Sequence, residues 1–217
     1  MEKVENREQA VEVLQEIGRT LYQRGLVNGA EGNISLRAGD GTVYISARGS
    51  RLGALRPEDV AHITTDGQAA EPGPEPTSEY LLHTLVYESC PELGVVLHTH
   101  SPHATAVAVN RENVPPLIDE MTILLGGGIG VAPYAAPGTM ELAQGAAQGL
   151  RERKGVLLAN HGAVVGGTDP ADALKLAELV EQACREVLLA KGGGTVHTIP
   201  PEAFERQREI YEKKRGR

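Results

Sequence analysis

Aromatic and sulfur-containing side chains are scarce in this sequence. It has no Trp, one Phe and two Cys in 217 residues, and aromatic residues make up 3% of the chain. A hydrophobic core must therefore be built from Val, Leu, Ile and Ala. The two cysteines, Cys90 and Cys184, lie far apart and form no C-x-x-C pair, which excludes a disulfide framework and a sulfur-rich zinc site. We expect both to be packing residues.

Excess positive charge and long apolar runs are also lacking. The formal net charge is -8 at pH 7, and a negative chain repels nucleic-acid phosphates and anionic lipid. No run approaches the ~18 consecutive apolar residues of a membrane span, and the polar start MEKVENREQA excludes a secretory signal. We therefore expect one cytoplasmic domain over residues 1–217 that binds a small molecule, with no nucleic-acid or membrane partner.

Several catalytic motifs are missing as well. There is no G-x-x-x-x-G-K-[ST] loop, GGGIGV does not have G-x-G-x-x-G spacing, and no G-x-S-x-G occurs, so nucleotide binding and a serine nucleophile have no support. The six lysines lie near the termini, in a loop or on predicted helices away from the histidines. A Schiff-base mechanism is therefore poorly supplied.

What is present is an alternation of helical and extended patterns. Apolar residues at steps of three and four predict helices, and short β-branched runs between turn residues predict strands. The predicted helices cover residues 7–24, 102–110, 138–153, 169–191 and 201–214, and another begins near a cap at Thr77 or Ser78. The predicted strands cover residues 34–37, 42–46, 60–65, 94–100 and 156–161, with an extended piece at 163–167. This layout predicts an α/β fold in which one sheet is flanked by helices.

Three of the seven histidines fall within VVLHTHSPHAT, residues 95–105. Side chains i and i+2 of a strand share a face, so His98 and His100 should lie side by side. His161, which ends the next apolar strand, adds a third imidazole. Three protein ligands of this type and an open position are typical of catalytic zinc, and Glu79 in PTSEY is the best candidate for an added carboxylate. The alternatives are core histidines bonded to backbone carbonyls and a glutamate that complements a helix dipole.

The other four histidines lie outside this set. His103 begins a short predicted helix after the cluster, and it either supports the ligands or lies at the surface. For His62, His83 and His197 the spacing favours structural roles.

Polar turns near Glu79 suit a phosphate. Thr77 and Ser78 bring two hydroxyls to a helix N-terminus, where free N–H groups and the helix dipole attract anions. The turns EGNIS and SARGS add Asn33, Arg48, Gly49 and Ser50 as possible donors. One junction could therefore hold both the anionic group of a small phosphorylated substrate and a catalytic carboxylate.

Five motifs occur together and in order along residues 7–190. They are GNIS (32–35), PTSE (76–79), HTHSPHATA (98–106), APYAAPGT (132–139) and NHG (160–162). With these motifs the sequence resembles the class II aldolase/adducin family, and most closely its L-fuculose-1-phosphate aldolase branch.

The resemblance implies a ligand set, a fold and an assembly. It implies Zn²⁺, or another divalent cation such as Mn²⁺ or Co²⁺, held by His98, His100, His161 and Glu79. The family's phosphate pocket maps onto Asn33, Gly49, Thr77 and Ser78. The implied fold is a three-layer arrangement with a nine-stranded, mostly antiparallel sheet, and the implied assembly is a homotetramer with sites at subunit interfaces.

The activity implied by the resemblance is cleavage of a small ketose 1-phosphate, similar to fuculose 1-phosphate, to dihydroxyacetone phosphate and an aldehyde. The cation would act as a Lewis acid, and Glu79 would shuttle the proton. Glu79 also favours cleavage over epimerisation, because the ribulose-phosphate epimerases have an aspartate at this position.

Two positions depart from the aldolase pattern. Arg48 replaces a hydroxyl residue, and it either strengthens phosphate binding or points elsewhere. Glu120 in DEMT replaces a tyrosine that acts as an acid near the adjoining subunit, and it resembles a catalytic glutamate of the family's methylthioribulose-1-phosphate dehydratases. Dehydration is therefore an alternative, although those dehydratases lack Glu79. Tyr211 is interpreted either as a cap over the site or as surface packing.

A non-catalytic module is the remaining alternative. The adducin heads share this fold as assembly domains without metal chemistry, and such a module would contain no stoichiometric divalent ion.

Overall fold

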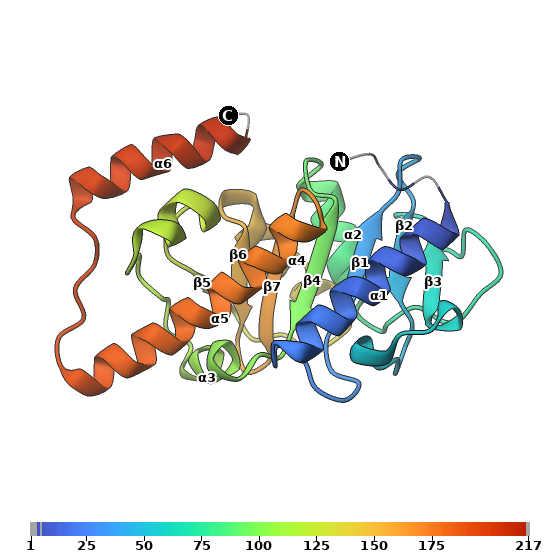
Figure 1. Ribbon diagram of the computed structural model, residues 1–217, viewed down its shortest axis with the longest axis horizontal. Coiled ribbons are helices and arrows are strands. Elements are labelled where there is room, and N and C mark those ends of the chain that lie inside the picture. Colours follow the sequence, from blue (N-terminus) through green and yellow to red (C-terminus); the bar gives the residue numbers. More distant parts are fainter. Residues whose placement is uncertain (1–3, 5, 216–217) are drawn as a thin grey trace.

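One seven-stranded sheet runs through the computed structural model, which describes residue 4 and residues 6–215 (Figure 1). The strand order is β3-β2-β1-β4-β7-β6-β5, and neighbouring strands are antiparallel except β5 and β6, which are parallel. The strands are β1 (Asn33–Arg37), β2 (Val43–Ser46), β3 (Val60–Ile63), β4 (Val95–Thr99), β5 (Gly130–Ala132), β6 (Gly155–Leu158) and β7 (Gly162–Gly167). The expectation of a mostly antiparallel sheet is confirmed.

The strand count differs from the nine implied by the resemblance. Over the described residues, three further extended segments touch the sheet or one another only through single bridges, which join Ala47 to Pro76, Ile63 to Ala69 and Val114 to Ile129. Prolines follow Val114, and Pro72 and Pro74 precede Pro76. Proline lacks the N–H that a longer ladder needs. These segments therefore do not extend the sheet.

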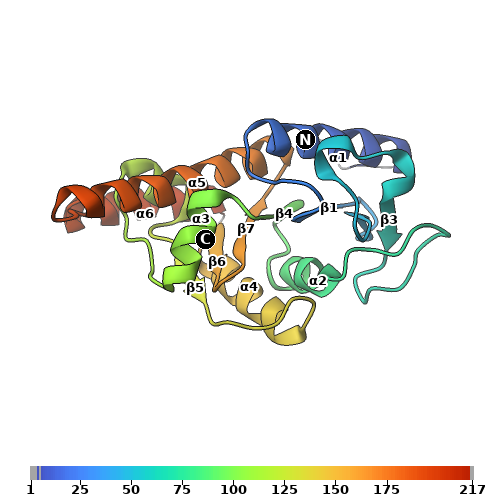
Figure 2. The ribbon, with the colours of Figure 1, turned by 90° about the horizontal axis from the view of Figure 1, so that it is seen from below.

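Helices cover both faces of the sheet, so the molecule has three layers (Figure 2). The helices α1 (Arg7–Gln23), α3 (Pro102–Asn110) and α5 (Pro170–Gly193) lie on one face, and α2 (Tyr80–Ser89) and α4 (Met140–Glu152) lie on the other. Because side chains alternate along a strand, β4 sends Val95 and Leu97 into the first layer and Val96 into the second. The predicted three-layer α/β fold is confirmed.

The core is mostly aliphatic, as the scarcity of aromatic residues predicts. Val, Leu, Ile and Ala supply almost all of the buried apolar side chains on both faces. Three tyrosines, Tyr44, Tyr87 and Tyr211, are exceptions, and Tyr87 and Tyr211 are the largest fully buried side chains. Cys90 and Cys184 are buried and form no disulfide bond, in agreement with the expected packing role.

The helices α1 and α5 each begin directly after a residue whose side chain caps the helix. The Asn6 side chain accepts a hydrogen bond from the Gln9 N–H before α1, and the Asp169 side chain accepts one from the Asp172 N–H before α5. The helices predicted for residues 7–24, 138–153 and 169–191 are confirmed to within two residues at each end. The shortest elements, which periodicity does not detect, were missed. They are β5, a π-helical turn at Met121–Leu125 and 3-10 turns at Leu52–Ala54 and Pro57–Asp59.

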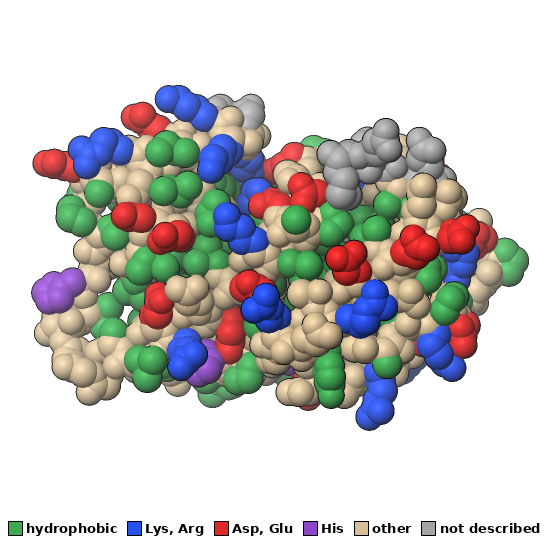
Figure 3. All heavy atoms as spheres, viewed as in Figure 1, with side chains coloured by type: hydrophobic (Ala, Val, Ile, Leu, Met, Phe, Trp, Pro, Cys, Tyr) green, Lys and Arg blue, Asp and Glu red, His purple; other side chains and the backbone are tan. Residues whose placement is uncertain are grey.

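Acidic and basic side chains are interspersed over the face seen in Figure 3. Two exposed pairs join helices or their connections across the surface, Arg24 with Glu178 and Lys191 with Glu112. Such pairs contribute ~0–1 kcal/mol each. No helix in the part of the chain that the structure describes is both long enough and apolar enough to cross a membrane.

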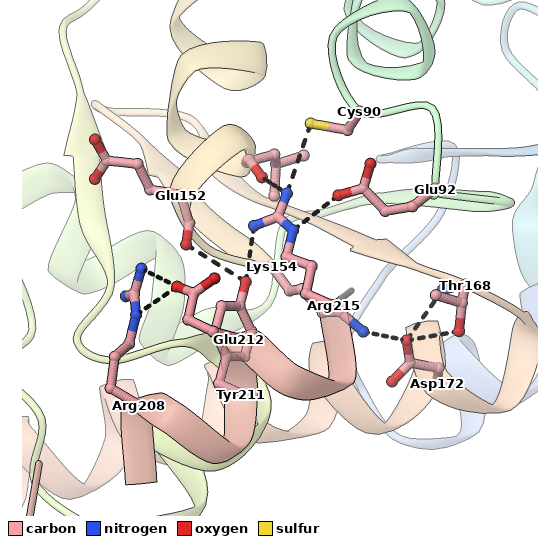
Figure 4. Close-up of polar contacts among 11 residues, drawn as sticks. Cys90, Glu92, Glu152, Lys154, Thr168, Asp172, Arg208, Tyr211, Glu212 and Arg215 are labelled. Atoms are coloured by element: carbon pink, nitrogen blue, oxygen red, sulfur yellow. Dashed lines mark hydrogen bonds and ion pairs between the residues drawn. The ribbon is translucent and has the colours of Figure 1, made fainter. Parts of the chain in front are cut away.

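The last helix, α6 (Pro201–Arg215), packs against the π-helical turn and is held by polar contacts (Figure 4). The Tyr211 hydroxyl lies 3.4 Å from the Glu152 carbonyl oxygen, to which it donates, and Arg215 donates to the Tyr211 oxygen at 2.8 Å. The Tyr211 ring lies against Gly126. Of the two interpretations of Tyr211, the structure supports packing, with the ring buried instead of at the surface.

Candidate functional site

Three histidines converge where β4 ends beside the start of β7. The two Nε2 atoms of His98 and His100 are 3.0 Å apart, and those of His98 and His161 are 3.3 Å apart. The three ring ligand atoms all lie within 4.8 Å of one another. The prediction that His98 and His100 share one side of the strand end, with His161 beside them, is confirmed. The triad could hold a metal ion.

His161 reaches the cluster from a turn instead of from a strand end. β6 ends at Leu158 and β7 begins at Gly162, so the predicted strand over residues 156–161 was too long. Asn160 has a φ of 57°, in the left-handed region that a tight hairpin requires and that Asn tolerates. This reversal places His161 beside the end of β4, because β7 pairs antiparallel with β4.

Two glycines allow the backbone to close around the cluster. A Cβ on Gly162 would lie 2.3 Å from the Thr99 carbonyl oxygen, and one on Gly32 would lie 2.6 Å from the His98 carbonyl oxygen. Gly32 also has a φ of 72°, which side chains rarely adopt. The glycines of GNIS and NHG therefore keep neighbouring segments in contact with the strand that carries the histidines.

The rings of His98 and His100 present neutral nitrogens. Burial, followed by the neighbouring imidazoles, holds the pKa of His98 well below its usual value, and burial lowers the pKa of His100 to about 4. His98 Nδ1 lies 3.0 Å from the Ala163 carbonyl oxygen, which can only accept, so Nδ1 carries the proton. The Nε2 lone pair of His98 therefore faces the cluster, which is the tautomer that a metal ligand needs.

Glu79, which directly precedes α2, adds a carboxylate beside the three histidines. Its Oε2 lies 3.4 Å from His98 Nε2, and its Oε1 lies 3.7 Å from His161 Nε2. The side chain is 9% exposed, yet Oε1 has no hydrogen-bond partner among the described residues. Burying a carboxylate oxygen without a partner is unfavourable unless a ligand satisfies it. The donor set of three imidazoles and one carboxylate fits a divalent cation such as zinc.

The start of α2 explains why Glu79 is available. The helix begins at Tyr80, and Glu79 is its N-cap residue without a side-chain capping bond. The prediction of a Thr77 or Ser78 cap was wrong by one or two residues, although Thr77 Oγ1 accepts from the Glu79 N–H at 3.4 Å. The glutamate does not cap its own helix, and its carboxylate turns toward the histidines.

Asn33 and His83 stand directly behind Glu79. Asn33 pairs with His98 across β1 and β4, and its Nδ2 donates to Glu79 Oε2 at 2.9 Å. His83 Nε2 lies 2.5 Å from Asn33 Oδ1. Sequence reasoning gave His83 only a structural role. The available signal was its spacing, because residue i+4 on a helix lies on the same side as residue i.

The predicted phosphate-binding residues lie on neighbouring segments. Ala47 bridges Pro76, and the Arg48 N–H donates to the Glu75 carbonyl, so the turn that carries Gly49 meets the segment before Thr77. Thr77 is buried and Ser78 is exposed. The Arg48 side chain pairs with Glu75 at 3.2 Å, and both are largely exposed. In this structure Arg48 therefore points toward a carboxylate. A phosphate role for Asn33, Gly49, Thr77 and Ser78 stays a prediction.

Glu120 is exposed and directly precedes the π-helical turn. Among the described residues of one protomer, no contact joins its side chain to the histidines or to Glu79. Its predicted acid/base role would place it near an adjoining subunit and stays a prediction.

His103 supports the chain after the cluster. Its Nδ1 lies 2.7 Å from Glu181 Oε1, and Glu181 also accepts from the backbone N–H groups of His103 and Ala104. The carboxylate of α5 thereby satisfies the free N–H groups at the start of α3. Of the two interpretations of His103, its contacts support one in which it anchors the segment that follows His100.

The comparison with known families decides what these residues belong to. The model of the class II aldolase and adducin N-terminal domain matches residues 12–188. The chain belongs to this family. The 5-deoxy-D-ribulose 1-phosphate aldolase of Bacillus thuringiensis serovar kurstaki is 31% identical to this class II aldolase family member over 196 residues, which is 90% of this chain and 92% of the relative.

One further relative and one solved structure are also similar to this chain. The 3-oxo-tetronate 4-phosphate decarboxylase of Haemophilus influenzae is 32% identical over 186 residues, which is 83% of this chain and 88% of the relative. A solved structure of an L-fuculose 1-phosphate aldolase has a TM-score of 0.88 at 29% identity and covers 94% of this chain and 96% of its own. The resemblance deduced from the motifs is confirmed.

Proposed function

We propose that this protein is a divalent-metal-dependent aldolase that cleaves a small ketose 1-phosphate, similar to fuculose 1-phosphate, to dihydroxyacetone phosphate and an aldehyde. The observation that carries the proposal is a cluster of three imidazole nitrogens beside a buried carboxylate, whose Oε1 has no hydrogen-bond partner among the described residues. Relatives of similar length that are named sugar-phosphate aldolases support the substrate class.

The cation, Zn²⁺ in the first place and Mn²⁺ or Co²⁺ otherwise, would be held by His98, His100, His161 and Glu79. When bound, it supplies a Lewis acid that stabilises negative charge on the substrate oxygens. His98 and His100 contribute neutral lone pairs, because burial keeps the pKa of His98 low and that of His100 at about 4.

Glu79 moves the proton. In cleavage the C3–C4 bond breaks, its electron pair stays on C3, the C4 hydroxyl loses its proton to leave an aldehyde, and C3 gains a proton. Glu79 Oε1 has no competing hydrogen bond among the described residues, so it is free to accept a proton and return it. Glu120 of an adjoining subunit is proposed as a second acid/base group in a homotetramer.

The phosphate would bind at the junction before α2. The hydroxyl of Ser78 is exposed there and that of Thr77 lies beside the free end of the helix, where N–H groups and the helix dipole favour an anion. Gly49 lies in the turn that meets this segment, and Asn33 contacts Glu79. The substrate could thus place its phosphate on the turns and its reacting carbons at the histidines.

The test is to incubate the metal-loaded protein with ketose 1-phosphates and ketose 5-phosphates and to measure triose phosphate, dehydrated product and epimer. We expect triose phosphate from a ketose 1-phosphate, and a Glu79→Gln variant that keeps its metal but loses at least ~100-fold in turnover, the lower range for a general acid/base. Turnover by Glu79→Gln at the parental rate would refute the acid/base assignment. A dehydrated product would favour the dehydratase alternative, an epimer the epimerase alternative, and a purified protein without stoichiometric metal an adducin-like module.

Decarboxylation of a 3-oxo acid phosphate is a second candidate. The observation that favours it is the decarboxylase relative, which is 32% identical over 186 residues. Loss of CO₂ from such an acid also leaves an electron pair on carbon beside a carbonyl, so the same residues could serve both reactions. Release of CO₂ from 3-oxo-tetronate 4-phosphate, without cleavage of ketose 1-phosphates, would select it. The homotetramer and the cytoplasmic location stay predictions.

A further inference from the structure

A continuous chain of buried hydrogen bonds lies behind the Glu79 carboxylate. From Glu79 it passes to Asn33 at 2.9 Å and to His83 at 2.5 Å. From His83 it continues to Ser35 at 2.7 Å and from Ser35 to Tyr87 at 2.8 Å. All five side chains are buried, and His83 and Ser35 are completely so. Of these five side chains, the proton transfer proposed above uses only Glu79.

The spacing of the chain comes from matched repeats on a helix and a strand. Glu79 precedes α2, and His83 and Tyr87 follow it at steps of four residues, which is about 6 Å along a helix. Asn33 and Ser35 lie two residues apart on β1, which is a little under 7 Å along a strand. The two rows therefore interleave, with each β1 side chain between two side chains from α2 and its N-cap.

The direction of every bond follows from the carboxylate at one end. An ionised carboxylate only accepts, so the Asn33 amide nitrogen donates to Glu79, and Asn33 Oδ1 must accept from His83 Nε2–H. His83 then carries its single proton on Nε2, and its Nδ1 accepts from the Ser35 hydroxyl. Ser35 Oγ in turn accepts from the Tyr87 hydroxyl. One assignment of protons satisfies the whole chain.

We propose that His83 is a positioning residue that acts through Asn33 to hold Glu79 Oε2 in place, which leaves Oε1 directed at the imidazole cluster. This inference rests on the proposed function, in which Glu79 is a metal ligand and proton carrier. Among the described residues, His83 has no hydrogen bond to the histidine triad, and it meets the proposed site only through Asn33. The hydrogen bond from His83 to Asn33 Oδ1 fixes the orientation of the Asn33 amide. The amide nitrogen then faces the Glu79 carboxylate.

A purely structural role would have different consequences. If the chain served only to satisfy buried polar atoms, any loss of the His83 contacts would lower stability without changing how the protein binds a metal. The two substitutions His83→Gln and His83→Asn separate these cases. Gln can place its amide nitrogen near the imidazole Nε2 and donate to Asn33, whereas Asn can reach only the Nδ1 position and contact Ser35.

The experiment measures Co²⁺ affinity against a chelator and the visible absorption of the Co²⁺ protein, alongside the urea unfolding midpoint. We expect His83→Asn to weaken Co²⁺ binding ~10–100-fold, the range for loss of a group that orients a metal ligand, and to change the absorption spectrum. We expect His83→Gln to recover most of that loss. His62→Asn, which removes a different histidine bonded to Thr42 on the other side of the sheet, is the matched control and should leave Co²⁺ affinity unchanged.

The outcomes are distinguishable. Equal Co²⁺ affinities and spectra for both His83 variants and the parent, with only the unfolding midpoint lowered, would overturn the positioning role and leave the proposed function intact. No Co²⁺ binding by the parent would overturn the proposed function itself. If His83→Asn does not fold, Ser35→Ala frees the tautomer of His83 by removing one hydroxyl. Weaker Co²⁺ binding is then expected, and parental binding would overturn the proposal.

Discussion

Two buried polar networks lie in different parts of the molecule, one behind Glu79 and one under α6. The network under α6 is closed, because Arg215 donates to the Glu92 carboxylate, the Tyr211 hydroxyl and the Leu150 carbonyl, each at 2.8 Å (Figure 4). The network behind Glu79 is open. Its last atom, Glu79 Oε1, has no hydrogen-bond partner among the residues that the structure describes.

The difference between the two networks separates a packing device from a binding site. Buried polar groups are normally satisfied, and Arg215, whose side chain is 2% exposed, follows this rule. The Glu79 network follows the rule at every atom except Glu79 Oε1, which faces His161. A ligand that accepts electron pairs, such as a divalent cation, would complete it. Substitutions in the open network should therefore affect metal binding, and those in the closed network should affect stability.

The largest effect is expected at the centre of the open network. His98→Ala removes the nitrogen that lies closest to both other rings and to Glu79. Loss of an outer partner typically costs 10–100-fold in affinity, so loss of this ligand should weaken metal binding by at least ~100-fold. Metal analysis after dialysis should find the ion depleted.

His197→Ala is the matched control for this prediction. His197 is exposed in the segment before α6, so the variant should keep its metal. Parental metal content in His98→Ala would remove the basis for treating the open network as a cation site.

A loss of stability without loss of metal is expected in the closed network. Arg215→Ala leaves the Leu150 carbonyl and the Glu92 carboxylate without this donor, which costs ~1–3 kcal/mol for a partly buried polar contact. Because α6 follows a segment without helix or strand at residues 194–200, we expect the helix to detach first. Limited proteolysis should cut this segment earlier than in the parent, while the metal content stays the same.

Lys213→Ala, which changes an exposed side chain on the same helix, should match the parent in proteolysis. If Arg215→Ala released the metal as readily as His98→Ala, the two networks would not be independent.

Local sequence patterns predicted which histidines lie together. The H-x-H pair requires only that alternate residues of a strand share a face, and His98 and His100 obey this rule. The role of Asn33 was different. Its motif and polarity suggested a phosphate ligand, but its side chain lies against Glu79 and His83, which are 46 and 50 residues away.

Such contacts depend on tertiary pairing that periodicity does not encode. Asn33 meets Glu79 because β1 pairs with β4 in one register and α2 packs on the same face of the sheet. The direction of the Glu79 side chain was hidden for the same reason, since a glutamate at a helix start usually interacts with its own helix dipole. The short strand β5 has only three residues within GGGIGVA, too few for an alternation to be detected.

The smallest effect is expected at the far end of the open network. Tyr87→Phe removes one hydroxyl, which donates to Ser35 and lies 3.4 Å from the Gly94 carbonyl. The cost should be ~0.5–1.5 kcal/mol in the free energy of unfolding, the usual net value of one hydrogen bond. Ser35 can still donate to His83 after this change, so the tautomer of His83 and the orientation of Asn33 are preserved. Co²⁺ affinity should therefore fall much less than in His83→Asn, as measured by the same chelator competition. An equal fall in both variants would mean that the whole chain acts as one cooperative unit, and positioning could then not be assigned to His83 in particular.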